Sequence, residues 1–520
     1  MKKSLQLLGV IFFLQFYHEN VIVVIFLQNI KPFKTYLMTA TISPYEKEIL
    51  LQTNCRKAAV EFIKIINDLW YDEAIELVIF RNPLIDKNVN EILRLHNYAS
   101  EFVNKPISVF DTVEVAKAIK TLKLSPSKID IGKLSYEFHK IAPDHDDVFS
   151  FISKKLKGHQ KHKSITPKDV VLYGFGRIGR LLARELMLKN GRGSQLRLRA
   201  IVTRGPINLE VLKKRGALLA NDSIHGEFPG TVKIDSNNMT LLVNGSSISM
   251  LSTDAPESMD YTTHGIKKAL VIDNTGAFRT KSALQRHLKA KGIEKVLLTA
   301  PGEGIPNIVY GINQNDYCPE KYSIFSAASC TTNAIAPILK VMDEVMGVDH
   351  GHLETIHAYT NDQNLVDNMH KKYRRGRAAG LNMVITETGA GKAVSKILPN
   401  LKGKLTSNAI RVPVPNGSLA ILNLEFNKKT TLKKLNNILR RHALEGTLVE
   451  QIKYESSDEL VSSDIIGSIA PAIFDSKATQ VRSNGKNAIL YIWYDNEYGY
   501  SQQVMRLAKY VAGVRRFTYH

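Results

Sequence analysis

A glycine-rich turn between an apolar strand and an amphipathic helix constrains the fold of this chain most strongly. In DVVLYGFGRIGRLLARELM, Gly174, Gly176 and Gly179 form the pattern G-x-G-x-x-G. The first glycine permits a tight turn, the second lets the backbone approach a pyrophosphate, and the third lets the helix pack closely on the strand. The N–H groups at the start of the helix can then hold the phosphates. In this context the pattern predicts a dinucleotide-binding site.

The segments that follow predict an α/β Rossmann dinucleotide-binding domain and an α+β catalytic domain. LRLRAIVT, ALVIDNTG and KVLLTAPG are further apolar strands that alternate with helices, which is typical of a doubly wound parallel sheet. From about His352, segments such as AILYIWYD favour an antiparallel sheet. We expect the Rossmann domain at residues 168–329, completed by a C-terminal helix at about 497–520, and the catalytic domain at 330–496.

The chain before residue 168 follows a different pattern. SPYEKEILLQ offers a capping box, Ser43 with Glu46, and EFIKIINDLW spaces its apolar residues as a helix does. Residues 38–153 are therefore predicted to be an extra N-terminal α-helical module, in which His96, His139 and Cys55 are core or surface residues rather than ligands. No metal site is predicted. Residues 154–167 are basic and aperiodic, and we interpret them as a linker.

The first 37 residues form an apolar leader. A basic start precedes an apolar run in MKKSLQLLGVIFFLQFY, but no small-residue cleavage site follows. Neither apolar run reaches the roughly 18 residues that span a bilayer. We therefore favour a natural start at Met38 over export, and we expect a cytoplasmic protein without a membrane partner.

Charge and cysteine content narrow the possible partners. The formal net charge is +21, which could attract nucleic acid or an anionic substrate. No aromatic RNA-binding signature and no long arginine run is present, so nucleic acid is not predicted as the main partner. The three cysteines, Cys55, Cys318 and Cys330, are an odd number and lie far apart, which favours a reducing compartment over a disulfide framework.

One of these cysteines stands where a nucleophile is expected. In SAASCTTNAIAP, Cys330 follows small residues and opens a helix, whose N-terminal potential favours the thiolate. Backbone N–H groups beside it could stabilise an oxyanion. His357, in ETIHAYTNDQ, lies on the following strand and could act as the base. A cysteine and a histidine in this arrangement favour covalent catalysis.

Together these motifs resemble those of glyceraldehyde-3-phosphate dehydrogenases. The matching segments, in the family's order, are GFGRIGR, NDSIHGEF, NTGAF, ASCTTN, HAYTNDQ, RRGRAAGLN, TGAGKAV, LKGKLTSNAIRVPVPN and WYDNEYGYS. They cover about Lys168 to Val514, and the first 167 residues lie outside the usual family chain. The family is usually a homotetramer. The resemblance implies that Cys330 attacks glyceraldehyde 3-phosphate, that His357 takes the proton and stabilises the oxyanion, and that inorganic phosphate cleaves the resulting thioester to give 1,3-bisphosphoglycerate.

The resemblance and the glycine turn together give a set of candidate site residues. Asn496 matches the residue that holds the nicotinamide carboxamide, and Arg375 stands close to both phosphate sites. The cofactor candidates are Gly174, Gly176, Arg177, Ile178, Gly179, Arg204, Thr275, Thr299 and Asn496. The substrate-phosphate candidates are Thr360, Asp362 and Arg411, and the inorganic-phosphate candidates are Ser329, Thr331, Thr388 and Gly389.

Two departures from the family bear on the cofactor. The acidic residue that usually binds the adenosine ribose of NAD is replaced by Thr203 and Arg204, and an arginine there could accept the 2′-phosphate of NADP. Asn368 and Met369 stand where NAD-specific bacterial members often carry Leu-Pro. The cofactor is therefore predicted to be NAD or NADP, with the preference open.

Other functions fit part of the pattern. Erythrose 4-phosphate oxidation and hydrolysis of the thioester use the same nucleophile, but Thr388 and Gly389 favour phosphorolysis. Aspartate-semialdehyde dehydrogenase also combines a nucleotide turn with cysteine and histidine, but HAYTNDQ and WYDNEYGYS argue against it. A regulatory homologue with low turnover is disfavoured by the intact catalytic residues. We also hypothesise that the helical extension tunes assembly or activity.

Overall fold

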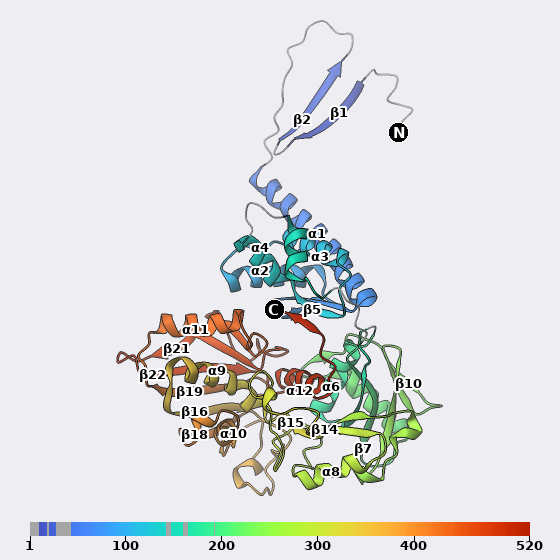
Figure 1. Ribbon diagram of the computed structural model, residues 1–520, viewed down its shortest axis with the longest axis vertical. Helices are drawn as coiled ribbons and strands as arrows, with labels where there is room; N and C mark the ends of the chain where they lie inside the picture. Colours follow the sequence, from blue (N-terminus) through green and yellow to red (C-terminus); the bar gives the residue numbers. More distant parts are fainter. Residues whose placement is uncertain (1–9, 18–19, 28–42, 142–146, 160–164, 192) are drawn as a thin grey trace.

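Two large α/β domains lie side by side beneath a smaller N-terminal module (Figure 1). The computed structural model describes residues 10–17, 20–27, 43–141, 147–159, 165–191 and 193–520. The C-terminus lies at the base of the N-terminal module rather than with the domain that it follows in sequence (Figure 1).

The first large domain is built on an eight-stranded sheet of order β10-β11-β12-β7-β6-β13-β14-β15. From β12 to β15 the strands are parallel and follow the 3-2-1-4-5-6 order of a dinucleotide-binding fold. The predicted Rossmann domain is confirmed. Its strands are β6 (Lys168–Tyr173), β7 (Leu196–Thr203), β10 (Val232–Asp235), β11 (Thr240–Val243), β12 (Ser246–Ser252), β13 (Ala269–Asp273), β14 (Ile293–Leu298) and β15 (Ile324–Ser326), and a short pair is formed by β8 (Asn221–Asp222) and β9 (Gly226–Glu227). Its helices are α6 (Arg177–Leu188), α7 (Leu209–Ala220), α8 (Lys281–Lys289) and the late α12 (Tyr498–Val511).

The second large domain carries a seven-stranded sheet of order β17-β18-β16-β19-β22-β21-β20. β16 pairs with β18 and β20 with β21 in parallel, and the other neighbours are antiparallel, so the predicted α+β domain has a mixed sheet. Its strands are β16 (Val348–Ala358), β17 (Val384–Thr386), β18 (Leu405–Val412), β19 (Ser418–Phe426), β20 (Ile452–Glu455), β21 (Ala472–Val481) and β22 (Asn487–Tyr494). Its helices are α9 (Cys330–Met346), α10 (Ala390–Ile397) and α11 (Leu432–Leu444).

The N-terminal module contains the predicted helices and also a small sheet that the sequence patterns did not indicate. Ser43 and Glu46 form the expected capping box at the start of α1. The sheet has the order β23-β5-β3-β4, and its edge strand β23 comes from the C-terminus of the chain. The helices are α1 (Pro44–Glu73), α2 (Val89–Val103), α3 (Val109–Thr121), α4 (Ile131–Ile141) and α5 (Val148–Lys155), and the strands are β3 (Ile75–Ile79), β4 (Asn82–Pro83), β5 (Ser127–Asp130) and β23 (Phe517–Tyr519).

The last residues therefore differ from the single C-terminal helix expected over 497–520. The helix α12 ends at Val511, and β23 pairs in parallel with β5, which aligns Phe517 with Ser127. Arg516 forms an ion pair with Glu76 of β3, and the side chains are only 5% and 4% exposed. The C-terminal segment thus ties the N-terminal module to the Rossmann domain.

The N-terminal module also shares a hydrophobic core with the catalytic domain. Buried side chains of α1 and α3 belong to the same cluster as those of α9, α11 and β19. Arg440 of α11 donates to the carbonyl of Phe102 at 2.7 Å, and Lys128 pairs with Glu450 at 2.9 Å. Because apolar and polar contacts both cross the boundary, the module is an integral part of the molecule.

The leader and the surface charge complete the description. Within the leader, β1 (Val10–Tyr17) and β2 (Asn20–Leu27) form an antiparallel pair, and the predicted start at Met38 falls outside the described residues. In the part of the chain that the structure describes, no helix is long and apolar enough to cross a membrane.

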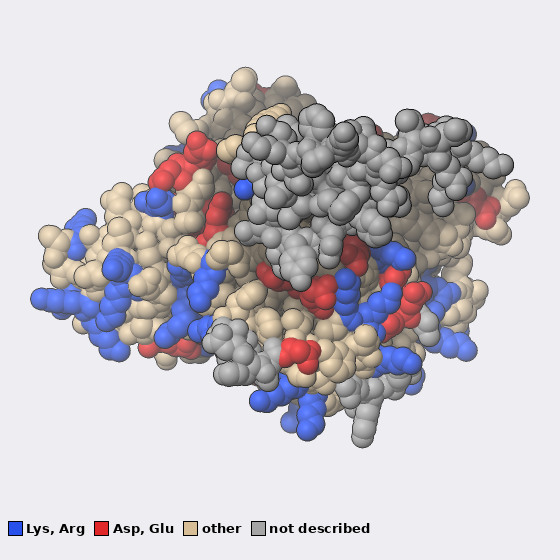
Figure 2. All heavy atoms as spheres, turned by 90° about the horizontal axis from the view of Figure 1, so that it is seen from above, with Lys and Arg blue, Asp and Glu red and all other residues tan. Residues whose placement is uncertain are grey.

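Figure 2 shows Lys and Arg side chains concentrated on the left of the view, the end where α11 lies. Such an excess of positive charge favours the approach of anionic molecules.

Candidate active site

The three glycines of the turn between β6 and α6 have three different environments. Gly174 has φ +98°, which favours glycine, and its N–H donates to Val202 at 2.9 Å. A Cβ on Gly179 would lie 2.4 Å from the carbonyl oxygen of Gly174. A Cβ on Gly176 would meet nothing within 4 Å. The first and third glycines are therefore required by the protein itself, whereas the second faces open space at the start of α6.

Polar atoms without partners face the same edge of the sheet. Thr203, at the end of β7, and Asn274, just after β13, each bury a side-chain oxygen that has no hydrogen-bond partner among the described residues. Thr275 donates its N–H and its hydroxyl to Asp273, and the N–H of Thr299 donates to the carbonyl of Asp273. Ligands of open parallel sheets bind at the carboxyl ends of the strands, and the open space and unpaired oxygens here fit a dinucleotide.

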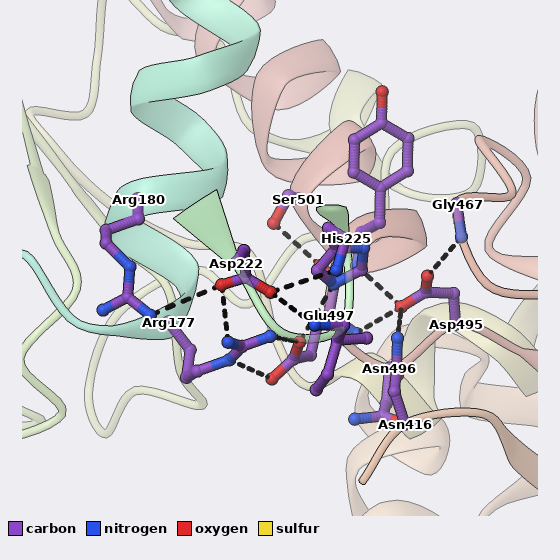
Figure 3. A network of polar contacts seen from close by, with 12 residues as sticks. Arg177, Arg180, Asp222, His225, Asn416, Gly467, Asp495, Asn496, Glu497 and Ser501 are labelled. Atoms are coloured by element: carbon purple, nitrogen blue, oxygen red, sulfur yellow. Dashed lines mark hydrogen bonds and ion pairs between the residues drawn. The ribbon is translucent and has the colours of Figure 1, made fainter. Parts of the chain in front are cut away.

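Arg177, the first residue of α6, is held by two carboxylates (Figure 3). Its Nη1 pairs with Asp222 at 2.6 Å, and its Nε donates to Glu497 at 2.8 Å. His225 also contacts Glu497, with Nε2 at 3.0 Å. Hydrogen bonds and the Arg177 charge lower the pKa of Glu497 against the opposing effect of burial. The network therefore fixes the start of α6 to the start of α12.

The same network positions Asn496 (Figure 3). Asp495 accepts hydrogen bonds from the backbone N–H groups of Glu497 and Tyr498 at 2.9 and 2.8 Å, and from Asn416 Nδ2 at 2.9 Å. Asn496 Oδ1 accepts from Ser418 at 2.8 Å, and its amide nitrogen has no hydrogen-bond partner in the part of the chain that the structure describes. The chain thus holds Asn496 in one orientation between β22 and α12.

Cys330 is the first residue of α9 and lies beside His357. The Sγ atom of Cys330 is 3.5 Å from Nε2 of His357, which occupies the end of β16. Ser329 caps the helix by accepting from the N–H of Thr332 at 3.1 Å. The residue before it, Ala328, has φ +54°, a sparsely populated conformation for a residue with a side chain. The predicted pair of nucleophile and base is therefore brought together at a strained turn.

Burial sets the protonation of this pair. Burial raises the pKa of the Cys330 thiol, while the Arg411 charge and hydrogen bonds from Thr331 lower it. The expectation that the helix start would dominate is therefore not met in this structure. Burial and the charge of Arg411 lower the pKa of His357 to about 3, so that the imidazole is neutral at pH 7. A neutral imidazole can accept a proton from the thiol.

Strand register explains why Arg411 belongs to this site. β16 and β18 run in parallel with His357 opposite Arg411. The Nη1 atom of Arg411 lies 2.7 Å from Nδ1 of His357 and donates to the carbonyl of Ala358 at 2.9 Å. Nδ1 is also 2.7 Å from that carbonyl. When Nδ1 carries the proton and donates it to Ala358, Nε2 is left unprotonated and faces the thiol.

A buried tyrosine that the sequence analysis did not select supports both residues. Tyr494 hydrogen-bonds the hydroxyl of Thr331 at 3.1 Å and that of Thr355 at 2.7 Å. Its ring stands edge-on to His357, with centroids 5.9 Å apart. Tyr494 lies within the motif WYDNEYGYS, two residues before Asn496, which was the only available signal. It joins the first turn of α9 to β16.

The candidates for the substrate-phosphate site form a second cluster. Thr360 and Arg375 both contact Asp362, and Arg375 Nε donates to Thr386 at 3.0 Å. The charge of Arg411 also acts on Asp362 and helps to lower its pKa. The loop after β16 thus places Arg375 and Asp362, and β18 places Arg411, beside the catalytic pair.

The candidates for the inorganic-phosphate site lie on two helices. Ser329 and Thr331 stand at the start of α9, whereas Gly389 caps α10 and Thr388 accepts from the N–H of Ala390 at 3.2 Å. α10 packs against α9 through Ala336 and Ile397. Among the described residues no hydrogen bond joins the two groups, and Thr331 is buried with its hydroxyl on Tyr494.

Comparison with known proteins matches both large domains. A model of the NAD-binding domain of glyceraldehyde-3-phosphate dehydrogenase matches residues 168–281, and a model of the C-terminal domain of the same enzyme matches residues 329–496. The glyceraldehyde-3-phosphate dehydrogenase-like protein of Pseudomonas aeruginosa UCBPP-PA14 is 47% identical over 458 residues, which cover 87% of this chain and 98% of the relative. The chain belongs to the glyceraldehyde-3-phosphate dehydrogenase family. It is therefore an oxidoreductase that uses NAD(P).

Two further members of the glyceraldehyde-3-phosphate dehydrogenase family match a shorter part of the chain. The enzyme of Kitasatospora aureofaciens is 40% identical over 337 residues, 65% of this chain and 96% of the relative. Glyceraldehyde-3-phosphate dehydrogenase 2 of Bacillus subtilis is 38% identical over 344 residues, 66% of this chain and 96% of the relative. The alignment with the Pseudomonas protein is longer than the chain from Lys168 onward, so that it must include part of the N-terminal module.

Proposed function

We propose that the protein is a phosphorylating glyceraldehyde-3-phosphate dehydrogenase with Cys330 as nucleophile and His357 as base. The observation that carries the proposal is the distance of 3.5 Å between the thiol and a neutral imidazole at the start of α9. An aldehyde must become tetrahedral before it can lose hydride, and an attacking thiol provides this step. The Cys330 sulfur bonds to the aldehyde carbon while its proton passes to Nε2 of His357. The protonated imidazole then faces the new alkoxide.

The cofactor would bind at the glycine turn and end at Asn496. Gly174, Gly176 and Gly179 would admit its pyrophosphate, Thr275 and Thr299 line its path, and Asn496 would receive the nicotinamide amide. Bound NAD(P) supplies the hydride acceptor that turns the thiohemiacetal into a thioester. Arg204 is exposed at the end of β7. We infer from this position that the protein accepts NADP as well as NAD.

Two anion sites would serve the substrates. Arg411, with Thr360 and Asp362, would hold the phosphate of glyceraldehyde 3-phosphate, and Arg375 would reach both anions. Inorganic phosphate would approach over Ser329, Thr331, Thr388 and Gly389 and attack the thioester carbon. The sulfur leaves as thiolate, the proton of His357 returns to it, and the acyl phosphate departs.

We also propose a homotetramer in the cytoplasm. The support is a row of exposed apolar side chains between residues 365 and 385, including Leu365, Met369, Tyr373 and Leu381, each more than 80% exposed. A patch of this kind usually marks a protein interface. The three cysteines are free, which suits a reducing compartment. Light scattering of the purified protein would test the assembly.

Turnover with controlled phosphate would test the activity. Cofactor reduction by glyceraldehyde 3-phosphate should require phosphate and should be lost in Cys330→Ser. Cofactor reduction at an equal rate without phosphate would show that water, rather than phosphate, cleaves the thioester. If no cofactor is reduced, or if erythrose 4-phosphate is much the better substrate, the proposal is wrong.

A further inference from the structure

A cavity of about 660 Å³ lies where the N-terminal module meets both large domains. Its walls come from the β3–β4 hairpin and β5 of the module, from the C-terminal end of α6, from α12 between Tyr498 and Lys509, and from the C-terminal segment of the chain. A volume of this size suits a small organic ligand. The residues of α6 that line the cavity are at its C-terminal end, and α6 is roughly 18 Å long, so that the cavity lies away from the glycine turn at the start of that helix.

The lining of the cavity is rich in cations. Nine Lys and Arg residues line it against six Asp and Glu residues. Four of the carboxylates already have partners, among them Glu91, which pairs with Lys87 at 2.9 Å. Glu450 pairs with Lys128 at 2.9 Å and approaches Arg506 at 3.7 Å, Glu185 pairs with Lys189 at 2.5 Å, and Glu76 pairs with Arg516. Lys453 pairs with Glu455, so Arg81, Lys509 and Arg515 are the lining cations that form no ion pair among the described residues.

Arg81 is the most distinctive of the remaining cations. Its side chain is buried, and Nη2 donates to the carbonyl of Ala443 at 2.5 Å. Nη1 is buried without a partner among the described residues. A buried charged donor of this kind is costly unless a ligand or a water satisfies it.

The backbone around Arg81 is strained to hold it there. Phe80 and Arg81 have φ +40° and +70°, although neither is glycine or asparagine, the usual residues at such positions of a two-residue hairpin. Both N–H groups donate to the buried carboxylate of Asp130, at 2.8 and 2.9 Å. Strain that the surrounding structure maintains is a feature of functional sites.

Two further cations lie on the C-terminal side of the cavity. Lys509 of α12 and Arg515 form no ion pair among the described residues, and Arg515 stands over the ring of Tyr310 at 5.5 Å. Burial and the neighbouring charges of Lys189 and Lys128 lower the pKa of Lys509 to about 7, although Glu185 and Glu450 oppose them. Lys509 is therefore only partly protonated near pH 7, and an anion bound beside it would favour its charged form.

We propose that this cavity binds a small phosphate-bearing anion through Arg81, Lys509 and Arg515. Guanidinium groups match the oxygens of a phosphate, and the rings of Trp70, Tyr98 and Tyr310 in the wall could contact a sugar or a base. Nucleotides and sugar phosphates share this chemistry. The site is distinct from the phosphate sites of the proposed reaction and does not depend on that reaction.

Isothermal titration calorimetry would test the site. Cys330→Ser protein saturated with NAD, which blocks the cofactor site, is titrated at constant ionic strength with pyrophosphate, adenosine 5′-monophosphate, ribose 5-phosphate and citrate. We expect one binding site per chain for at least one phosphate probe, and weaker binding of citrate. Tighter binding of the nucleotide than of ribose 5-phosphate would identify a nucleotide site, and equal binding would identify the phosphate alone as the determinant.

Variants assign the binding to the cavity. Lys509→Gln and Arg515→Gln should each weaken the probe at least about tenfold, as loss of a charged hydrogen bond predicts. Lys402→Gln, at an exposed lysine outside the cavity, is the matched control and should bind as the parent does. Arg515 is exposed, so its variant keeps the test valid if Lys509→Gln fails to fold. No binding of any phosphate probe, or equal affinity in the variants and the control, would overturn the proposal.

Discussion

Substitution by alanine should lower the stability of the protein at Gly179 but not at Gly176, although both glycines belong to the nucleotide turn. A Cβ on Gly179 would lie 2.4 Å from the Gly174 carbonyl oxygen, well inside contact distance, so that α6 must shift. Overpacking of this kind costs about 1–3 kcal/mol of stability. Gly176 has φ −82° and open space around its Cβ position, so Gly176→Ala should change stability by less than about 1 kcal/mol.

Cofactor affinity should fall in both variants, but in Gly176→Ala it should fall without a loss of stability. If the pyrophosphate approaches the backbone at Gly176, a methyl group there displaces it and removes a charged hydrogen bond worth about 1.5–3 kcal/mol. The dissociation constant for NAD(P) should rise roughly 10- to 100-fold in Gly176→Ala while the urea midpoint is retained. Gly179→Ala should lower the urea midpoint as well as the affinity.

Titration calorimetry and urea denaturation on the two variants measure both quantities. Wild-type cofactor affinity in Gly176→Ala would refute the assignment of the open space to the cofactor. An unchanged urea midpoint in Gly179→Ala would refute the packing argument, since it would mean that α6 and the turn adjust without cost.

Three further substitutions have definite outcomes. His357→Asn should lower kcat about 10²- to 10⁴-fold without unfolding the protein, because it removes the base beside Cys330, and a kcat within a factor of ten would contradict this role. Arg204→Ala should raise KM for NADP more than KM for NAD, and equal changes would show that Arg204 does not meet the 2′-phosphate. Arg516→Ala leaves Glu76 buried and unpaired, so the free energy of unfolding should fall by about 3–5 kcal/mol and limited proteolysis should release the N-terminal module, whereas unchanged stability would show that the ion pair does not hold the module.

Local patterns were sufficient for the parts of the fold that local spacing determines. The glycine turn, the apolar strand before it and the amphipathic α6 all lie within residues 168–188, and the structure has them as the sequence predicts. The capping box of Ser43 and Glu46 is a contact over three residues and was found for the same reason. In each case the interacting residues are close in sequence.

The small sheet of the N-terminal module could not be found in this way. β23 pairs with β5 although Phe517 and Ser127 are 390 residues apart in sequence, and neither strand exceeds four residues. Pairing across such a separation leaves no periodic signal. The sequence therefore predicted that the C-terminal helix continues to residue 520, although α12 ends at Val511.

The candidate site likewise has residues that local motifs predict and contacts that depend on the tertiary fold. Cys330 and His357 stand in motifs that could be recognised, and the structure places them in contact. Arg177 is held by the carboxylates of Asp222 and Glu497, which come from distant elements. Only the folded structure shows these two contacts. The protonation of Cys330 also depends on burial, which a helix-start argument does not include.

The most direct test is the stoichiometry and phosphate dependence of a single reaction. Purified protein is mixed with glyceraldehyde 3-phosphate and NAD or NADP, with and without phosphate, beside Cys330→Ser. The account predicts sustained cofactor reduction only with phosphate, one acyl phosphate formed per cofactor reduced, and no reduction in the variant. Sustained reduction without phosphate, or reduction by Cys330→Ser, would contradict the assignment of a phosphorylating reaction at Cys330.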